Sequence, residues 1–135
     1  MVEIVKELVL YLRLAQAFKN KLKIPDRDRA LVLAGTCAAI LEMNCIDNFC
    51  RKIILQNNHG HMLKRWQSFS EAIRQEDFGV FLKQIRRKFS IERAESLLCE
   101  FSYECDVVRE DYNSDEEFAS AVMGIDHQWL TENFS

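Results

Sequence analysis

Glycine and proline are scarce in this sequence, with only four glycines and one proline in 135 residues. Globular proteins average about 7% glycine and 5% proline, so the chain holds few of the residues that make tight turns. An all-β fold, which needs many such turns, is therefore disfavoured. The four glycines also lie far apart in the sequence, which excludes a phosphate-binding P-loop and a dinucleotide fingerprint.

Long hydrophobic runs are absent as well. The longest, residues 30–41, has twelve residues, whereas a transmembrane helix needs about 18 or more. Near the N-terminus, charged residues such as Lys6 and Arg13 interrupt the apolar stretch that a signal peptide requires. The chain has five cysteines, an odd number, whereas a secreted disulfide framework usually has an even one. We therefore predict free thiols and a cytoplasmic or nuclear location.

Apolar residues recur at spacings of three and four along most of the chain, which predicts helices. The first helix is expected over residues 2–22, and Pro25 separates it from a second helix at about 26–43. The second helix is apolar nearly all round and rich in alanine, so we expect it to be buried and central. The predicted fold class is all-α, with residues 1–135 forming one domain, a compact bundle of six to seven helices.

The same periodicity predicts further helices at about 45–56, 62–73 and 78–89. Ser90 is the expected N-cap of the next helix, whose apolar stripe continues to Val108.

Ser114 and Glu117 have the spacing of a capping box, so a short helix is expected to begin there and to end at Gly124. Residues 126–134 are expected to add one or two final turns.

Charge is distributed unevenly along the sequence. The net charge is +1 for residues 1–50, +6 for residues 51–93 and −10 for residues 94–135, for a total of −3. The chain therefore has a basic middle and an acidic C-terminal segment that begins at about residue 94.

Three interpretations of this asymmetry remain open. The acidic segment folds back over the basic middle and neutralises it, or each charged surface meets a different protein partner, or the basic middle binds nucleic acid. The acidic segment would repel a polyanion, so nucleic acid is the weaker candidate. We expect a non-enzymatic adaptor or scaffold module that docks an acidic or amphipathic segment of a protein partner. The alternative is a nucleic-acid-binding domain that uses residues 51–93.

The predicted contact surface combines basic side chains with one aromatic residue, because arginine and aromatic side chains dominate the energetics of protein interfaces. Its residues are Arg51, Lys64, Arg65, Trp66, Arg74, Lys83, Arg86 and Arg87.

Two serines match short phosphorylation patterns. Ser90 follows a run of basic residues, and Ser114 precedes acidic ones. A phosphate on either would sit at a predicted helix N-terminus, where backbone N–H groups favour it. The alternative role for both serines is helix capping alone.

Residue types that can bind zinc occur near one another at Cys45, Cys50, His59 and His61. Five residues along a helix turn Cys50 about 140° away from Cys45, so we interpret the thiols as buried and the imidazoles as exposed. His127 is a further candidate partner for a nucleophilic cysteine, but no glycine-rich oxyanion turn accompanies any cysteine. The sequence predicts no enzyme, no metal and no cofactor.

Overall fold

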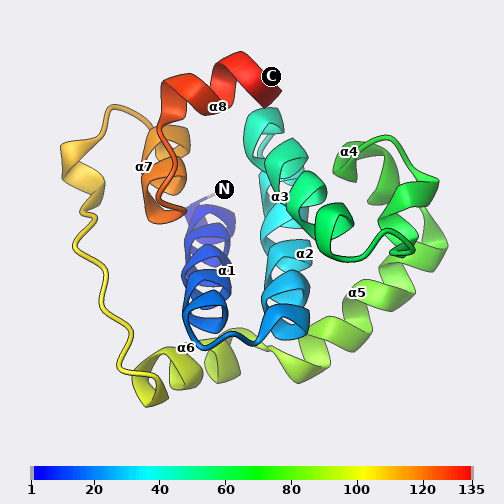
Figure 1. The fold of residues 1–135 in the computed structure, drawn as a ribbon, viewed down its shortest axis with the longest axis horizontal. Helices are drawn as coiled ribbons and strands as arrows, with labels where there is room; N and C mark the ends of the chain where they lie inside the picture. Colours follow the sequence, from blue (N-terminus) through cyan, green and yellow to red (C-terminus); the bar gives the residue numbers. More distant parts are fainter. Residues whose placement is uncertain (1, 135) are drawn as a thin grey trace.

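The computed structural model describes residues 2–134, which form eight α-helices and two 3₁₀ helices and contain no strand (Figure 1). The α-helices are α1 (Val2–Asn20), α2 (Ile24–Ile40), α3 (Asn44–Asn57), α4 (Phe69–Ala72), α5 (Glu76–Lys88), α6 (Ile91–Glu100), α7 (Asp115–Val122) and α8 (His127–Phe134). The 3₁₀ helices are η1 (Met62–Arg65) and η2 (Arg109–Asp111). The all-α prediction is confirmed. None of the helices in the described part of the chain has the length and apolarity to cross a membrane.

Helix α2 is the buried central helix that the sequence predicts. Every residue from Ala30 to Ala39 is buried, and the helix packs against α1, α3, α4 and α5. Figure 1 shows α1 and α2 side by side in the middle of the molecule. Gly35 lets the ring of Phe69, from α4, lie directly on the backbone of α2. The helix begins and ends two to three residues earlier than the predicted 26–43.

Helix α1 holds the ends of two other helices by side-chain hydrogen bonds. The hydroxyl of Tyr11 donates to the carbonyl of Phe89, which caps α5, at 2.8 Å. The amide of Gln16 donates to the carbonyl of Met123, which caps α7, at 2.6 Å. Tyr11 is fully buried, and burial raises its pKa to about 12, so the hydroxyl stays a donor.

Four helices of the described chain, α1, α2, α6 and α7, end in the same left-handed turn. The turn residues are Leu22, Glu42, Ser102 and Gly124, with φ of 59°, 60°, 51° and 74°. In each turn, the N–H of the next residue donates to the carbonyl five positions earlier, at 2.8 to 3.0 Å. This hydrogen bond defines the Schellman motif. Only one of the four positions is glycine, the residue that adopts this conformation without steric cost.

The predicted helix over residues 62–73 is wrong. Two short helices, η1 and α4, replace it, and the backbone at Trp66 and Ser68 is extended. The physical reason is a cap: the hydroxyl of Ser68 accepts the N–H of Glu71 at 3.2 Å, and an N-cap residue lies outside the helix.

The predicted stripe from Ser90 to Val108 is also too long. Helix α6 ends at Glu100, and Val108 lies in an irregular segment that leads to η2. The chain leaves the helix because Ser102 adopts the left-handed conformation. Residues 2–134 contain eight α-helices rather than the predicted six to seven, because His127–Phe134 forms a helix of its own.

Asp47 is a buried carboxylic acid on α3. Its exposed fraction is 1%, and its Oδ2 atom has no hydrogen-bond partner among the described residues. Burial raises the pKa of this carboxyl from 3.8 to about 7. The folded protein therefore keeps this proton at pH values where the unfolded chain has released it.

Gly35→Ala should destabilise the fold, because a Cβ at this position would overlap the ring of Phe69. We expect a loss of about 1–3 kcal/mol in the free energy of unfolding, measured by urea denaturation. Gly79→Ala on α5 is the matched control, since a Cβ there meets no atom within 4 Å. It should raise stability by about 0.5–1 kcal/mol. Equal effects of the two substitutions would contradict the close approach of α4 to α2.

Asp47→Asn should change how stability depends on pH. Between about pH 4 and pH 7 the folded state holds a proton that the unfolded state has lost, so Asp47 lowers stability as pH rises. The slope from one such group is at most about 1.4 kcal/mol per pH unit. Urea denaturation across this range should show that Asp47→Asn removes this decline, whereas Asp106→Asn at an exposed position does not. If the free energy of unfolding changes with pH in the same way for the wild type and for Asp47→Asn, then the pKa of Asp47 is not raised in the folded state.

Candidate interaction face

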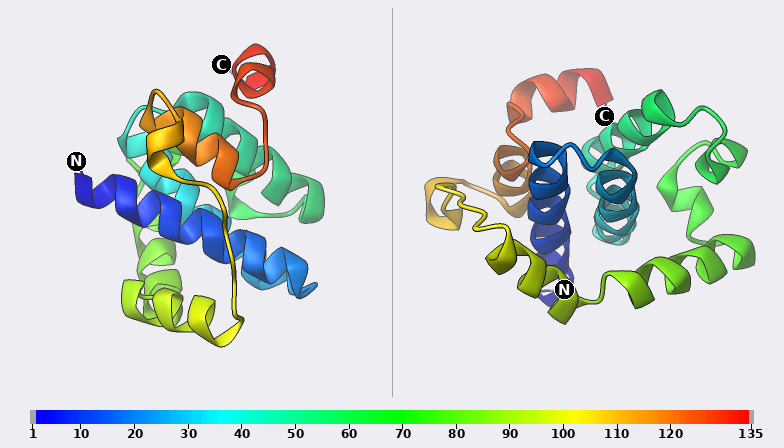
Figure 2. Two further views of the ribbon diagram at one scale, coloured as in Figure 1. Left: turned by 90° about the vertical axis from the view of Figure 1, so that its left-hand side faces the viewer. Right: turned by 60° about the horizontal axis from the view of Figure 1, so that its bottom comes forward.

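The predicted contact residues lie on α3, on η1 and on the segment from α4 to α5. We call residues 62–88, which comprise η1, α4 and α5, the basic arm. The arm forms one side of the molecule, shown in green in Figures 1 and 2, and α5 runs along its edge. Its exposed cations are Lys64, Arg65, Arg74, Lys83, Arg87 and Lys88, of which Lys88 lies 3.5 Å from Asp26 of α2.

Helix α5 is amphipathic, which fixes the side that it shows to solvent. Phe78 and Ile85 are buried against the core. Val80, Lys83 and Arg87 follow one another at spacings of three and four, so they share the outer side of the helix, and all three are exposed. Val80 keeps 55% of its surface in solvent. The outer side of α5 thus carries one apolar side chain followed by two cations.

Arg51 and Trp66 connect the arm to the core. The Nη2 atom of Arg51, on α3, donates to the carbonyl of Trp66 at 2.7 Å. The indole of Trp66 meets the ring of Phe78 edge-on, with centroids 5.8 Å apart, and is half-buried. Arg51 therefore has a structural partner within the fold, and it positions the chain where η1 ends.

His61 is the N-cap of η1. Its Nδ1 atom accepts the N–H of Leu63 at 3.1 Å, and its ring packs edge-on against Phe81, with centroids 5.6 Å apart. Burial lowers the pKa of His61, although the Asp28 carboxylate acts in the opposite direction. Burial is the larger effect, so the imidazole is neutral near pH 7. Its Nδ1 atom can therefore accept the hydrogen bond that caps η1.

The cations of the predicted surface differ in whether an acidic side chain faces them. Arg86 lies 3.8 Å from Glu7 of α1, and Arg65 lies 3.9 Å from Asp77 at a solvent-exposed position. Exposed pairs of this kind contribute little to stability. Arg51 donates to the Trp66 carbonyl instead. For the remaining four, Lys64, Arg74, Lys83 and Arg87, no carboxylate within residues 3–134 lies within ion-pair distance.

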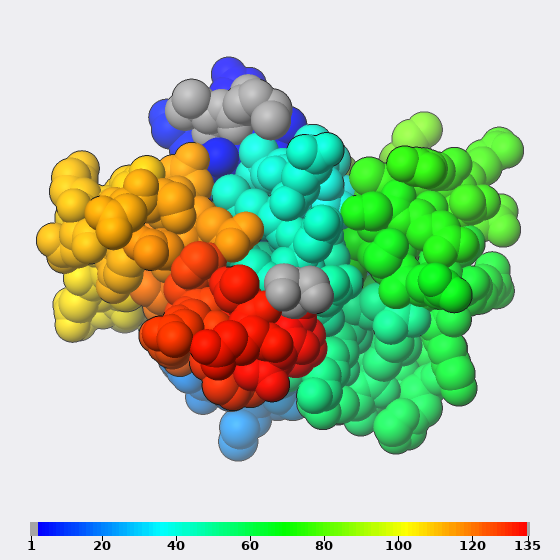
Figure 3. Space-filling model, turned by 90° about the horizontal axis from the view of Figure 1, so that it is seen from above, coloured from blue at the N-terminus to red at the C-terminus, as the bar shows by residue number. Residues whose placement is uncertain are grey.

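The acidic C-terminal segment lies elsewhere. Helix α6 packs on α1, α7 on α1 and α3, and α8 on α3 and α7. Figure 3 shows α7 in orange and the arm in green, with cyan residues of the core between them. In the described chain, one ion pair joins residues 51–93 to residues 94–135, and it is local to α6: Arg93 to Glu100 at 3.9 Å. The interpretation in which the acidic segment neutralises the basic middle is therefore wrong.

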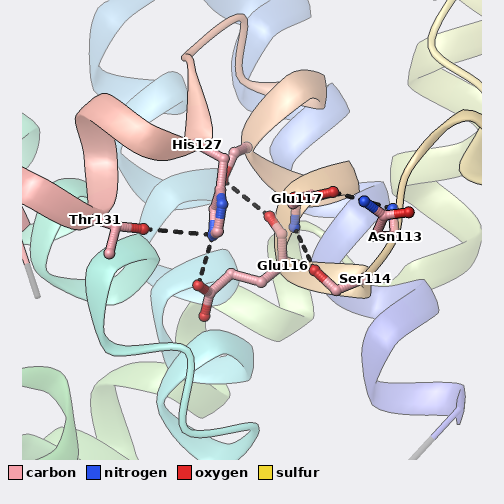
Figure 4. Close-up of polar contacts among 7 residues, drawn as sticks. Asn113, Ser114, Glu116, Glu117, His127 and Thr131 are labelled. Atoms are coloured by element: carbon pink, nitrogen blue, oxygen red, sulfur yellow. Dashed lines mark hydrogen bonds and ion pairs between the residues drawn. The ribbon is translucent and has the colours of Figure 1, made fainter.

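Ser90 and Ser114 both cap helices, as the sequence predicts. The hydroxyl of Ser90 accepts the N–H of Arg93 at 3.2 Å, and that of Ser114 accepts the N–H of Glu117 at 3.1 Å. Figure 4 shows Ser114 and Glu117, whose carboxylate in turn accepts the N–H of Asn113. Ser90 is exposed and Ser114 is half-buried.

The cysteines and histidines of the segment 45–61 do not come together. Cys45 and Cys50 are both buried, whereas His59 is exposed. The structure instead brings Cys45 beside Glu116 and His127, with one potential ligand atom from each and all three atoms within 4.8 Å of one another. The sequence offered no spacing pattern for this group, because Cys45 on α3 is about 70 residues away from Glu116 on α7 and about 80 from His127 on α8.

No protein-family model, curated protein or solved structure matches the chain.

Arg51→Ala should destabilise the fold, because it leaves the Trp66 carbonyl without its charged donor. We expect a loss of about 1.5–3 kcal/mol in the free energy of unfolding, measured by urea denaturation. Lys64→Ala, which removes an exposed cation of the arm, should change stability by no more than about 0.5 kcal/mol. If Arg51→Ala is as mild as Lys64→Ala, then Arg51 does not hold the arm.

Proposed function

We propose that this chain is a non-enzymatic adaptor module whose basic arm docks an acidic or amphipathic segment of a protein partner. The observation that carries the proposal is charge separation. Four exposed cations of the arm face no carboxylate within residues 3–134, and the acidic helices pack on α1 and α3 instead. A surface with uncompensated positive charge attracts a negatively charged partner and steers it during encounter.

The outer side of α5 supplies the chemistry for such a contact. Val80 offers an apolar contact, and Lys83 and Arg87 lie on the same side, one and two turns further along. A partner helix with apolar and acidic residues at matching spacing would cover Val80 and place its carboxylates on the two cations. Arg87 adds geometric selectivity, since a guanidinium can bind a carboxylate through two parallel hydrogen bonds.

The proposal includes a reducing compartment, either the cytoplasm or the nucleus. Its support is that all five cysteines are free and three of them are buried. Buried free thiols behave as small apolar side chains and persist where disulfides are kept reduced.

Phosphorylation of Ser90 is part of the proposal as a means of weakening the contact. Ser90 is exposed, and it follows the basic C-terminal turn of α5. A phosphate there would add negative charge next to the cations of the arm. Ser114 is a poorer candidate, because its phosphate would lie among the carboxylates of the first turn of α7.

Nucleic acid is the alternative partner. The distance between the acidic helices and the arm removes part of the repulsion that the sequence suggested. Phosphate binding by the arm would show itself as an affinity that falls steeply with salt.

Reversing the charge of the outer side of α5 should abolish partner binding. The double variant Lys83→Glu, Arg87→Glu turns two attractive cations into repulsive anions, whereas Lys6→Glu, Lys19→Glu on α1 makes the same net change at other exposed positions. Tagged wild type and both variants are used to capture partners from lysate, with and without nuclease, after circular dichroism confirms equal helix content.

We expect a stoichiometric protein on the wild type and on the α1 variant, resistant to nuclease and reduced at least tenfold on the α5 variant. Equal recovery on the α5 variant excludes the arm as the docking surface. Recovery that depends on nucleic acid and fails after nuclease treatment supports the alternative partner.

A further inference from the structure

Cys45, Glu116 and His127 form a compact group where α3 meets the two last helices, α7 and α8. The three potential ligand atoms, a sulfur, an oxygen and a nitrogen, all lie within 4.8 Å of one another. The Nε2 atom of His127 is 2.8 Å from Oε1 of Glu116, and the hydroxyl of Thr131 is 3.5 Å from the same nitrogen. Figure 4 shows His127 pointing toward Glu116, and the contacts from Glu116 and Thr131 meet at the same ring nitrogen.

We infer that Cys45, Glu116 and His127 bind a single divalent transition-metal ion, with zinc as the best match. This site is independent of the basic arm and of any partner that the arm binds. It also departs from the expectation of no metal, which considered Cys45 only together with Cys50, His59 and His61.

The donor set selects the metal. A thiolate with an imidazole and a carboxylate is typical of zinc, whereas magnesium and calcium prefer oxygen ligands alone. Around a tetrahedral zinc ion the bond lengths place ligand atoms about 3.3–3.6 Å apart. The group therefore needs only a small adjustment to bind zinc. The Nε2 atom of His127 and the Oε1 atom of Glu116 must move apart from 2.8 Å, and the sulfur of Cys45 must move closer to both. The side chains of His127 and Glu116 are 30% and 31% exposed, which leaves the fourth position open to water.

The surroundings of the ligands determine their charges with and without a bound ion. Cys45 is 4% exposed, and burial, together with the neighbouring Glu116 carboxylate, raises its pKa to about 12. Without a metal, the sulfur therefore keeps its proton. Metal binding releases that proton to solvent, and the thiolate, the carboxylate and the divalent ion then sum to zero charge. Cys45 and Glu116 are the second residues of α3 and α7, where backbone N–H groups favour the anionic thiolate and carboxylate.

The ion would connect the C-terminal helices to the core. Helix α8 meets α3 through aromatic contacts, with Phe49 edge-on to Trp129 at 6.3 Å and to Phe134 at 5.3 Å. The metal adds a bond from each of α3, α7 and α8 to one centre. The ion stabilises the folded state because it binds that state alone.

The test begins with reduced protein from which metal has been removed by a chelator. Cobalt is added as a spectroscopic substitute for zinc, and zinc affinity is then measured by competition. We expect one ion per chain, a tetrahedral visible spectrum and a near-ultraviolet band for charge transfer from sulfur to cobalt. Zinc should also raise the melting temperature of the wild type.

Variants show whether these three side chains are the ligands. Cys45→Ser should lose the sulfur band, and His127→Gln should weaken zinc binding beyond the roughly 10–100-fold cost of losing an outer-shell partner. Cys99→Ser and His59→Gln remove the same residue types at exposed positions and should bind like the wild type. If Cys45→Ser fails to fold by circular dichroism, Glu116→Gln at its half-exposed position decides the question by the same titration.

Two results would overturn the inference. One is a wild-type protein that binds no cobalt or zinc, or binds them without the sulfur band and without a rise in melting temperature. The other is a band that survives in a folded Cys45→Ser and disappears in Cys99→Ser, which would place the metal on an exposed thiol.

Discussion

Helix α2 is enclosed by its neighbours on every side, and the rest of the molecule is arranged around it. From Ala30 to Ala39 no residue is exposed, and most side chains in this stretch are small. Small residues let neighbouring helices approach closely, and at Gly35 the ring of Phe69 lies on the helix itself. Phe69 in turn meets Phe78 of α5 edge-on, with centroids 6.2 Å apart. The position of the basic arm therefore follows from the absence of a side chain at one residue of α2.

The two charged segments are kept apart by the same central helices. Helix α1 holds the end of α5 through Tyr11 and the end of α7 through Gln16. Positive charge thus collects on α5 and negative charge on the C-terminal helices, with the apolar core between them. The total net charge of −3 does not reveal this separation. It follows from the charges of the separate segments and from where those segments lie in the fold.

Periodicity in the sequence predicted the central helix, α5 and the capped start of α7, because each combines a regular apolar stripe with a recognisable boundary residue. It failed at residues 62–73, where the apolar spacing continues but Ser68 caps a new helix. It also failed after Glu100, where Ser102 takes the conformation that glycine usually signals. The group of Cys45, Glu116 and His127 was not predictable, because the packing of α3 against α7 and α8 creates it.

The residues with positive φ that end four of the helices also affect the unfolded chain. Glycine has the largest backbone freedom before folding and loses the most entropy when it is fixed. Leu22, Glu42 and Ser102 have less freedom to lose, so the unfolded ensemble is narrower than it would be with glycine at these helix ends. The strain of a positive φ in the folded protein is thus partly offset by lower disorder in the unfolded one. A helical chain with four glycines can in this way turn sharply at positions where its sequence shows no break.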